Sequence, residues 1–172
     1  RIWGSYSYED TPYVDQKVVY CGYMVNHWGH FLVEATARLW FFLKNDCTVD
    51  KYVFVLNRNE AREIKANYKE FFTLLNIWDK LEFINEPTTY REVIVPELSF
   101  RFRNYYSNDF LKVFNRVSEN VKPDSTWETP SKIYFSRSKL AKGNGMEFGL
   151  DMLDDFYRKN GYTILHPERV PL

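Results

Sequence analysis

Residues 26–42, NHWGHFLVEATARLWFF, have the spacing of a helix whose surface is almost entirely apolar. At about 100° of rotation per residue, four ionisable side chains fall within roughly an 80° arc of this helix: His27, His30, Glu34 and Arg38. A surface helix normally has the opposite balance, with a broad polar face and a narrower apolar stripe. We therefore expect a helix that is buried nearly all round, with one ionisable strip facing a cleft or a buried polar partner.

The segments around this helix alternate between strand and helix patterns. Residues 17–24, KVVYCGYM, are β-branched and aromatic and predict a buried strand. Asn26 is a suitable N-cap for the helix that follows, and residues 1–16 predict an irregular lead-in. Further strands are expected at residues 51–56, 81–84, 92–96, 132–136 and 162–165, and further helices at about residues 60–77 (capped by residues 57–59), 107–121 and 146–160.

This alternation predicts an α/β domain with a mainly parallel sheet. The domain is expected to span residues 17–121, and the Pro-, Ser- and Thr-containing stretch 122–131 is expected to be a loop or linker. Residues 132–172 are then expected to form a strand–helix–strand that completes the domain. In such sheets ligands bind beyond the carboxyl ends of the strands, which are the positions of the start of the central helix and of the loop after Arg137.

The composition of the 172-residue chain argues against several classes of partner. Lys plus Arg and Asp plus Glu each number 23, so the net charge is zero, which disfavours broad electrostatic binding to nucleic acid or anionic lipid. Two cysteines and no Asn-x-Ser/Thr sequon favour a reducing cytoplasm over a disulfide-stapled domain. The apolar run near the central helix is too short to span a bilayer, and the sequence predicts no signal peptide. Any membrane association is therefore expected through parts outside this chain.

The ionisable strip is compatible with three kinds of chemistry. Glu34 and Arg38 are spaced i, i+4 and could form an internal salt bridge beside a hydrogen-bonded core histidine. His30 and Glu34 share that spacing, and a carboxylate beside an imidazole raises its basicity, which suits proton removal from a hydroxyl. His27, His30 and Glu34 could instead hold a metal ion, as in a metal-dependent hydrolase, although this spacing is not a standard zinc signature.

Arg137 is a second candidate, because it follows a predicted strand and precedes a loop that contains Lys139 and Lys142. The loop is either an ordinary solvated turn or a clamp for a phosphate or carboxylate. Neither a Walker loop nor a Gly-x-Gly-x-x-Gly motif after a strand is present. Nucleotide binding in the usual N-terminal crevice is therefore not expected.

Three stretches together resemble family 61 glycosyltransferases. Residues 26–34, with Arg38 and Leu39 beyond, resemble the first signature of that family, which is an Asn, then a His, then an acidic residue four positions on. Residues 132–137, KIYFSR, resemble its strand ending in Ser-Arg, and residues 161–168, GYTILHPE, resemble its Gly-aromatic strand ending in Pro-Glu. The three motifs occur in the order of the family and cover the chain nearly end to end.

The resemblance implies an inverting glycosyltransferase of GT-B architecture, in which two Rossmann-like three-layer domains face a cleft. Such enzymes transfer a sugar from a nucleotide-sugar donor to a hydroxyl of a glycan acceptor, here in surface (capsular) polysaccharide biosynthesis, and require no further cofactor. This chain would be the N-terminal, acceptor-side part, leading to a donor-binding half that it lacks. Bacterial members imply a cytoplasmic location, and eukaryotic relatives imply the lumen of the secretory pathway.

The resemblance also implies roles for particular residues. His30 and Glu34 would be the catalytic pair, with the choice of the base between them left open, and no metal ligand is implied. The substrate-binding residues would be Asn26, His27, Arg38 and Arg137. The main alternative is a non-catalytic glycan-binding or scaffold domain of the same fold.

Overall fold

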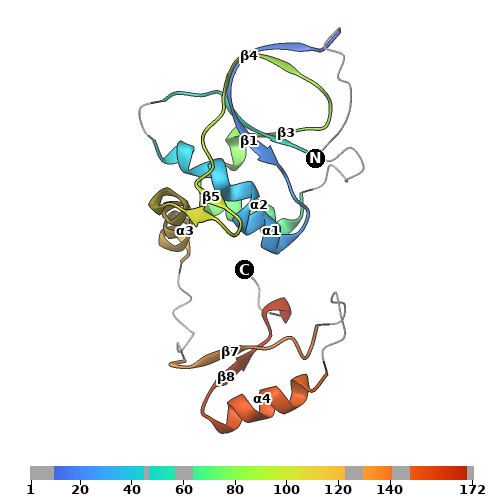
Figure 1. The fold of residues 1–172 in the computed structure, drawn as a ribbon, viewed down its shortest axis with the longest axis vertical. Coiled ribbons are helices and arrows are strands. Elements are labelled where there is room, and N and C mark those ends of the chain that lie inside the picture. The colour runs from blue at the N-terminus through green and yellow to red at the C-terminus, as the bar shows by residue number, and fades with distance from the viewer. Residues whose placement is uncertain (1–9, 45–46, 57–63, 123–129, 141–147, 170–172) are drawn as a thin grey trace. The chain divides into compact units, whose positions relative to one another are not determined.

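The computed structural model describes residues 10–44, 47–56, 64–122, 130–140 and 148–169. The chain forms two compact units, Arg1–Lys122 and Pro123–Leu172. Figure 1 shows a larger unit that contains the main sheet and a smaller strand–helix–strand unit. Within the described ranges, no helix has the length and apolar character that a membrane crossing requires.

The main sheet consists of β1 (Tyr13–Tyr23), β2 (Lys51–Val55), β3 (Leu81–Ile84) and β4 (Thr89–Ile94). The strand order is β3-β2-β1-β4, and each neighbouring pair is parallel. The prediction of an α/β protein with a parallel sheet is thus confirmed, and the architecture is compatible with a Rossmann-like fold. The predicted strand at 81–84 is confirmed to the residue.

Two strands begin earlier than their sequence patterns indicate. β1 starts at Tyr13, so the irregular lead-in predicted for residues 1–16 is wrong from that residue on. Tyr13 is paired with Thr89, the first residue of β4, which itself begins before the predicted range 92–96. Pairing between the two strands extends both, although Tyr13 and Thr89 are themselves exposed and give no apolar signal.

The central helix is shorter and less regular than predicted. An α-helix, α1 (Trp28–Val33), gives way to a 3₁₀ helix, η1 (Ala35–Leu43), so the single helix predicted over 26–42 is wrong. Ser99 donates both its backbone N–H, at 2.8 Å, and its hydroxyl, at 2.7 Å, to the carbonyl oxygen of Ala37. This oxygen is one that a continuous α-helix would use internally, and the tertiary bonds to it accompany the tighter 3₁₀ turn.

The N-cap of α1 is His27 rather than the predicted Asn26. His27 has extended backbone angles, φ −142° and ψ 116°, and its Nδ1 accepts from the backbone N–H of His30 at 3.5 Å. The helix therefore begins one residue later than the Asn26 cap required.

The remaining elements of the first unit are two helices and a small hairpin. α2 (Ala66–Leu74) lies inside the predicted range 60–77, and the expected caps at residues 57–59 lie outside the described residues. α3 (Asn108–Asn120) has Ser107 as its N-cap, as predicted. The antiparallel pair β5 (Phe100–Arg101) and β6 (Tyr105–Tyr106) is an element that the sequence analysis did not predict.

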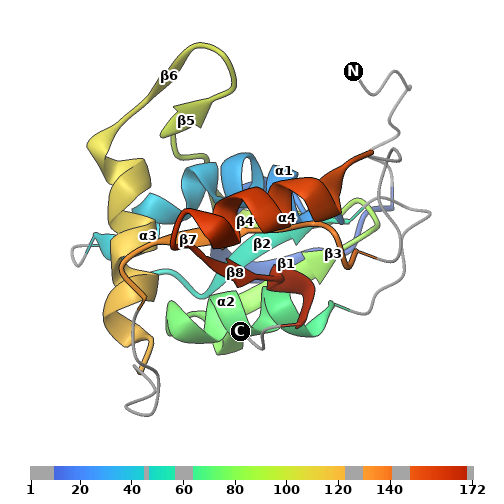
Figure 2. The same ribbon diagram turned by 90° about the horizontal axis from the view of Figure 1, so that it is seen from below.

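The core of the first unit is built from aromatic rings. Phe31 of α1 has no exposed surface, and it packs edge-on against Phe71 and Phe72 of α2 at ring distances of 5.2 and 5.4 Å. The core also takes in Phe54 of β2 and Val113 of α3. Figure 2 shows α1 and α2 with the strands of the main sheet from below. The high aromatic content is thus used largely for packing.

The second unit contains β7 (Ile133–Phe135), α4 (Leu150–Lys159), β8 (Thr163–Leu165) and η3 (Pro167–Arg169). β7 and β8 are parallel and form a two-stranded sheet of their own. The expected strand, helix and strand are present, but within the described residues they form a compact unit of their own and do not extend the main sheet, as the prediction that residues 132–172 complete the domain required. α4 begins later than residue 146, which lies outside the described ranges. Tyr157 of α4 stacks on Tyr134 of β7 at 3.9 Å, which fixes the helix on one face of the sheet.

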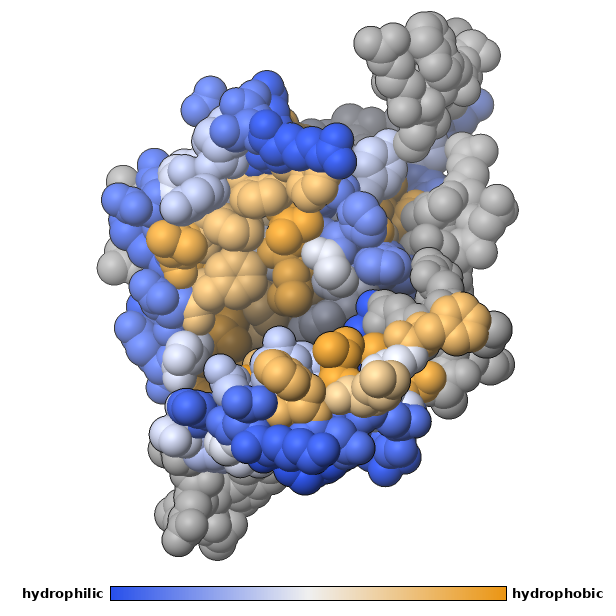
Figure 3. All heavy atoms as spheres, turned by 60° about the horizontal axis from the view of Figure 1, so that its bottom comes forward, coloured by the Kyte–Doolittle hydropathy of each residue, from blue (hydrophilic) through white to orange (hydrophobic). Residues whose placement is uncertain are grey.

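Large apolar side chains remain at the surface of the second unit. Phe148 is 87% exposed and Met152 is 77% exposed, and Phe135 and Phe156 are also exposed. Figure 3 shows hydrophobic side chains at the surface of both units. A two-stranded parallel sheet with one helix buries only part of its apolar surface, whereas parallel sheets are normally covered on both faces.

Candidate functional site

A histidine and a glutamate lie in contact just beyond the carboxyl end of β1. His30 Nδ1 and Glu34 Oε1 are 2.7 Å apart, and the side chains are 57% and 47% exposed. The backbone N–H of Glu34 donates to the carbonyl oxygen of His30 at 2.7 Å, so the chain is still helical across this turn. That turn brings the two side chains together at the predicted i, i+4 spacing.

The contact determines which imidazole nitrogen is available for proton transfer. A carboxylate only accepts hydrogen bonds, so Nδ1 of His30 donates to Glu34. In the neutral imidazole Nε2 then carries the lone pair. The pair can therefore accept a proton at Nε2 while Glu34 stabilises the resulting imidazolium.

His27 lies beside this pair but has a structural contact of its own. Its ring is 4.9 Å from the ring of His30, with the planes at 69°, and its Nδ1 caps α1. Among the described residues there is no group of three or more His, Cys, Asp or Glu side chains arranged to hold a metal ion. His27, His30 and Glu34 thus do not form the three-ligand site that the metal-hydrolase alternative needs.

Arg38 is not part of the His30–Glu34 group, so the predicted four-residue strip is wrong. Its Nε donates to the carbonyl oxygen of Pro96 at 3.0 Å, and its guanidinium lies over the ring of Tyr20 at 5.6 Å. No ion pair between Glu34 and Arg38 exists in the part of the chain that the structure describes. The 3₁₀ helix rotates the chain by about 120° per residue, so residues after Glu34 leave the phase of the α-helical strip.

Two predicted binding residues lie in different parts of the chain. Asn26 is exposed in the loop between β1 and α1. Arg137 is exposed in the second unit, just after β7, at the carboxyl end of that strand as predicted.

A buried polar cluster beside Arg137 was missed by the sequence analysis. Asp154 of α4 is 5% exposed, and its Oδ2 accepts the hydroxyl of Ser138 at 2.6 Å. Ser136 has no exposed surface, and its Oγ accepts the backbone N–H of Ser138 at 3.0 Å. The signal available in the sequence is spacing, because Asp154 lies four residues after Leu150 and three before Tyr157, on one side of the helix.

The charges around Asp154 favour its ionised form. Burial alone would raise the pKa of the Asp154 carboxyl, but hydrogen bonds from Ser136 and Ser138 and the charges of His166 and Arg158 hold that pKa below its ordinary value. Asp154 Oδ1 and His166 Nδ1 are buried with no hydrogen-bond partner among the described residues. Polar atoms of this kind are commonly joined by an ordered water.

No protein-family model, curated protein or solved structure matches this chain. The fold and the site therefore give the structural class of the protein. It is a mixed α/β protein with a four-stranded parallel sheet compatible with a Rossmann-like fold, and an imidazole–carboxylate pair follows the carboxyl end of β1.

Proposed function

We propose that this chain is the acceptor-side part of an inverting glycosyltransferase of GT-B architecture. Its substrates would be a nucleotide-sugar donor and a hydroxyl of a glycan acceptor in surface polysaccharide biosynthesis. The observation that supports the proposal most directly is the 2.7 Å contact between His30 and Glu34 beyond the end of a parallel strand, where ligands of such sheets bind.

The proposed step needs one base, which the His30–Glu34 pair can supply. The acceptor oxygen attacks the anomeric carbon from the face opposite the leaving group, and a new carbon–oxygen bond forms. The bond between the anomeric carbon and the phosphate oxygen breaks, and the nucleoside phosphate (UDP, GDP or CMP, according to the donor) leaves with the electron pair. The acceptor proton moves to Nε2 of His30, and Glu34 holds the imidazole in the required tautomer.

Arg137 is the proposed contact for an anionic group of the substrate. It lies between Ser136, whose buried Oγ accepts the backbone N–H of Ser138 at 3.0 Å, and Ser138, whose hydroxyl donates to the buried Asp154 carboxylate at 2.6 Å. Because the residues on either side are held in this way, the backbone that carries the guanidinium is restrained before a ligand binds. A planar guanidinium suits a phosphate or carboxylate.

The test is transfer and donor hydrolysis by the intact protein with UDP-, GDP- and CMP-sugars, with and without a chelator. We expect His30→Ala to lower kcat by about 10²–10⁴-fold, as loss of a general base does, and Glu34→Gln to lower it as well. The matched control is Asp109→Asn, which removes a carboxylate that pairs with Lys112 at 2.7 Å and is 44% exposed.

Unchanged turnover in both His30→Ala and Glu34→Gln would refute the proposed base. Saturable glycan binding without turnover of any donor would favour the non-catalytic glycan-binding alternative. Activity that disappears with the chelator would point instead to a metal-dependent reaction.

A further inference from the structure

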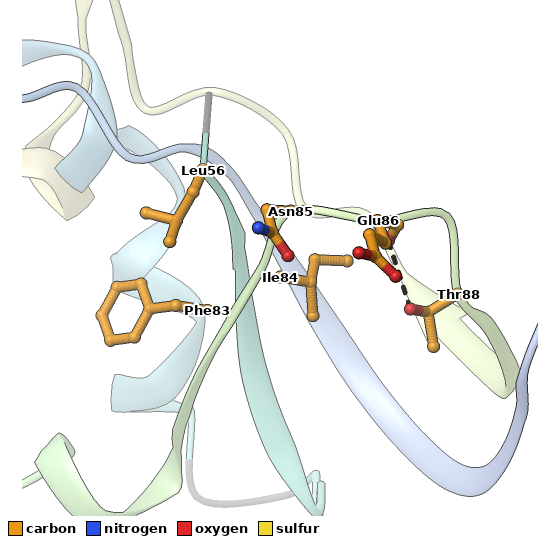
Figure 4. Close-up of a pocket in the computed structure, with 6 residues that line it drawn as sticks. All are labelled: Leu56, Phe83, Ile84, Asn85, Glu86 and Thr88. Carbon is orange, nitrogen blue, oxygen red and sulfur yellow. Dashed lines mark hydrogen bonds between the residues drawn. The ribbon is translucent and has the colours of Figure 1, made fainter. Parts of the chain in front are cut away.

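A pocket opens at the carboxyl ends of β2 and β3, with a volume of about 290 Å³. Figure 4 shows Leu56 and Phe83 on one side of it, Glu86 and Thr88 on the other, and Ile84 and Asn85 between them. None of these residues belongs to the motifs that carry the glycosyltransferase resemblance.

The pocket shares an edge of the sheet with the His30–Glu34 pair. The backbone N–H of Met24, just after β1, donates to the carbonyl oxygen of Val55 at 2.9 Å. The N–H of Leu56 donates to the carbonyl oxygen of Ile84 at 2.7 Å. The ends of β1, β2 and β3 are therefore adjacent, and α1 continues from that same edge. This is the edge at which open parallel sheets bind ligands.

The lining combines an apolar wall with hydrogen-bonding groups. Phe83 is held by ring contacts with Phe54 at 5.8 Å and Phe72 at 6.3 Å, so this wall is fixed by the core. Asn85 can donate and accept, Thr88 carries a hydroxyl, and Glu86 accepts. Thr88 Oγ1 already donates to the carbonyl oxygen of Glu86 at 3.2 Å, which ties the two ends of this turn together.

The charge and the size of the pocket favour a small, uncharged ligand. Glu86 is the charged residue of the described lining, and a carboxylate repels a phosphate or a second carboxylate. A volume of about 290 Å³ lies just below the range of about 300–1,000 Å³ for small-molecule sites, which suits one ring better than a nucleotide-sugar. A sugar ring has apolar C–H faces for the Leu56–Phe83 wall and vicinal hydroxyls for Asn85 and Glu86.

We propose that this pocket binds one ring of a neutral glycan through Asn85, Glu86 and Thr88, with Phe83 and Leu56 as its apolar wall. This inference rests on the proposed function, because the bound ring would belong to the glycan acceptor of the proposed glycosyltransferase. It names the class of ligand as uncharged and rich in hydroxyls. The residues that would bind this ring are distinct from the proposed base, His30 with Glu34.

Binding is tested by saturation-transfer NMR of the intact protein with the methyl glycosides of glucose, galactose and mannose. UMP serves as an anionic probe, and inorganic phosphate, which has no carbon-bound protons to observe, is added as a competitor of the glycoside signal. We expect saturable binding of at least one glycoside, weakened about five- to thirtyfold by the double variant Glu86→Gln/Thr88→Val, which replaces a charged acceptor by a weaker neutral one and removes the Thr88 hydroxyl. The control Glu119→Gln removes an exposed carboxylate of α3 that pairs with Arg116 at 3.3 Å, and it should leave binding unchanged.

Three results would overturn the pocket assignment. They are the absence of glycoside binding at millimolar concentrations, binding that the double variant leaves unchanged, and preferential binding of phosphate or UMP at the same residues. We expect the variants to fold, because Glu86 is exposed and Thr88 is half-buried. Circular dichroism of each variant is the check.

Kinetics separate this inference from the proposed function. In an active enzyme, Glu86→Gln/Thr88→Val should raise the acceptor KM with little change in kcat, while His30→Ala should lower kcat. Turnover with an unchanged acceptor KM in the double variant would refute the pocket and leave the transferase standing. Variant-sensitive glycoside binding without turnover of any donor would refute the transferase and leave the pocket standing.

Discussion

Replacement of Asp154 by alanine tests whether the second unit depends on its buried carboxylate. The side chain is 5% exposed and accepts a hydrogen bond from Ser138 at 2.6 Å. A hydrogen bond to a charged group contributes about 1.5–3 kcal/mol, and water can replace part of the bond to the half-buried Ser138. We therefore expect Asp154→Ala to lower the stability of this unit by about 2–4 kcal/mol.

Hydrogen exchange of the amides that join β7 to β8 measures this loss. The Ser136 N–H donates to the carbonyl oxygen of Leu165 at 2.7 Å, and the Thr163 N–H donates to that of Lys132 at 2.9 Å. A loss of about 2–4 kcal/mol corresponds to exchange that is roughly 30- to 1,000-fold faster. These two amides report on the second unit independently of the first.

The matched control is Asp155→Ala on the same helix. The Asp155 carboxylate is 64% exposed and pairs with Arg158 at 2.6 Å, and exposed pairs of this kind contribute about 0–1 kcal/mol. Equal exchange rates in Asp154→Ala and Asp155→Ala would refute the reasoning, because they would show that burial adds nothing to the role of Asp154.

The Asp154 carboxylate should also make the stability of the second unit depend on pH, with a loss of stability in acid. The folded-state pKa of Asp154 lies below its ordinary value, so the folded state favours the ionised form more than the unfolded state does. The associated stability is fully present above about pH 4 and is lost as the pH falls through the folded-state pKa. Asp154→Asn should lack this component, and acid titration of amide exchange in both proteins measures the difference.

Two further predictions concern the first unit. Gly22 has φ +103°, and a Cβ there would lie 3.3 Å from a guanidinium nitrogen, so Gly22→Ala should cost about 1–3 kcal/mol in urea unfolding; an unchanged midpoint would contradict this strain. Phe31 has no exposed surface, so Phe31→Ala should cost about 3–5 kcal/mol. The control Phe102→Ala, at a side chain that is 63% exposed, should change stability far less, and equal losses in the two variants would contradict the core assignment.

The parallel sheet could be predicted because its strands carry strong local signals. Residues 51–56 and 81–84 are short stretches dominated by aromatic and aliphatic residues, and they form β2 and β3 nearly as expected. The first residues of β1 have no such signal, since Tyr13 is exposed and is ordered by pairing with Thr89. The two-residue strands β5 and β6 are too short to show any periodicity.

The break in the central helix depends on a contact that sequence spacing cannot reveal. Ser99 lies 62 positions from Ala37, and its N–H and hydroxyl both bond to the Ala37 carbonyl oxygen. In the sequence, residues 26–42 have the apolar and ionisable spacing of a single helix. Arg38 was placed with the ionisable strip for that reason, whereas in the folded chain it holds the Pro96 carbonyl.

The exposure of the His30–Glu34 pair indicates how much the pair contributes to the stability of the fold. Its side chains are 57% and 47% exposed, and pairs with this exposure contribute about 0–1 kcal/mol to stability. The pair therefore contributes little to folding, in contrast to the Asp154 carboxylate, which is buried and accepts the Ser138 hydroxyl. The side chains of His30 and Glu34 can thus be replaced with little effect on the stability of the fold, whereas that of Asp154 cannot. A loss of turnover in Glu34→Gln would accordingly report on the chemistry of the pair and not on the integrity of the fold.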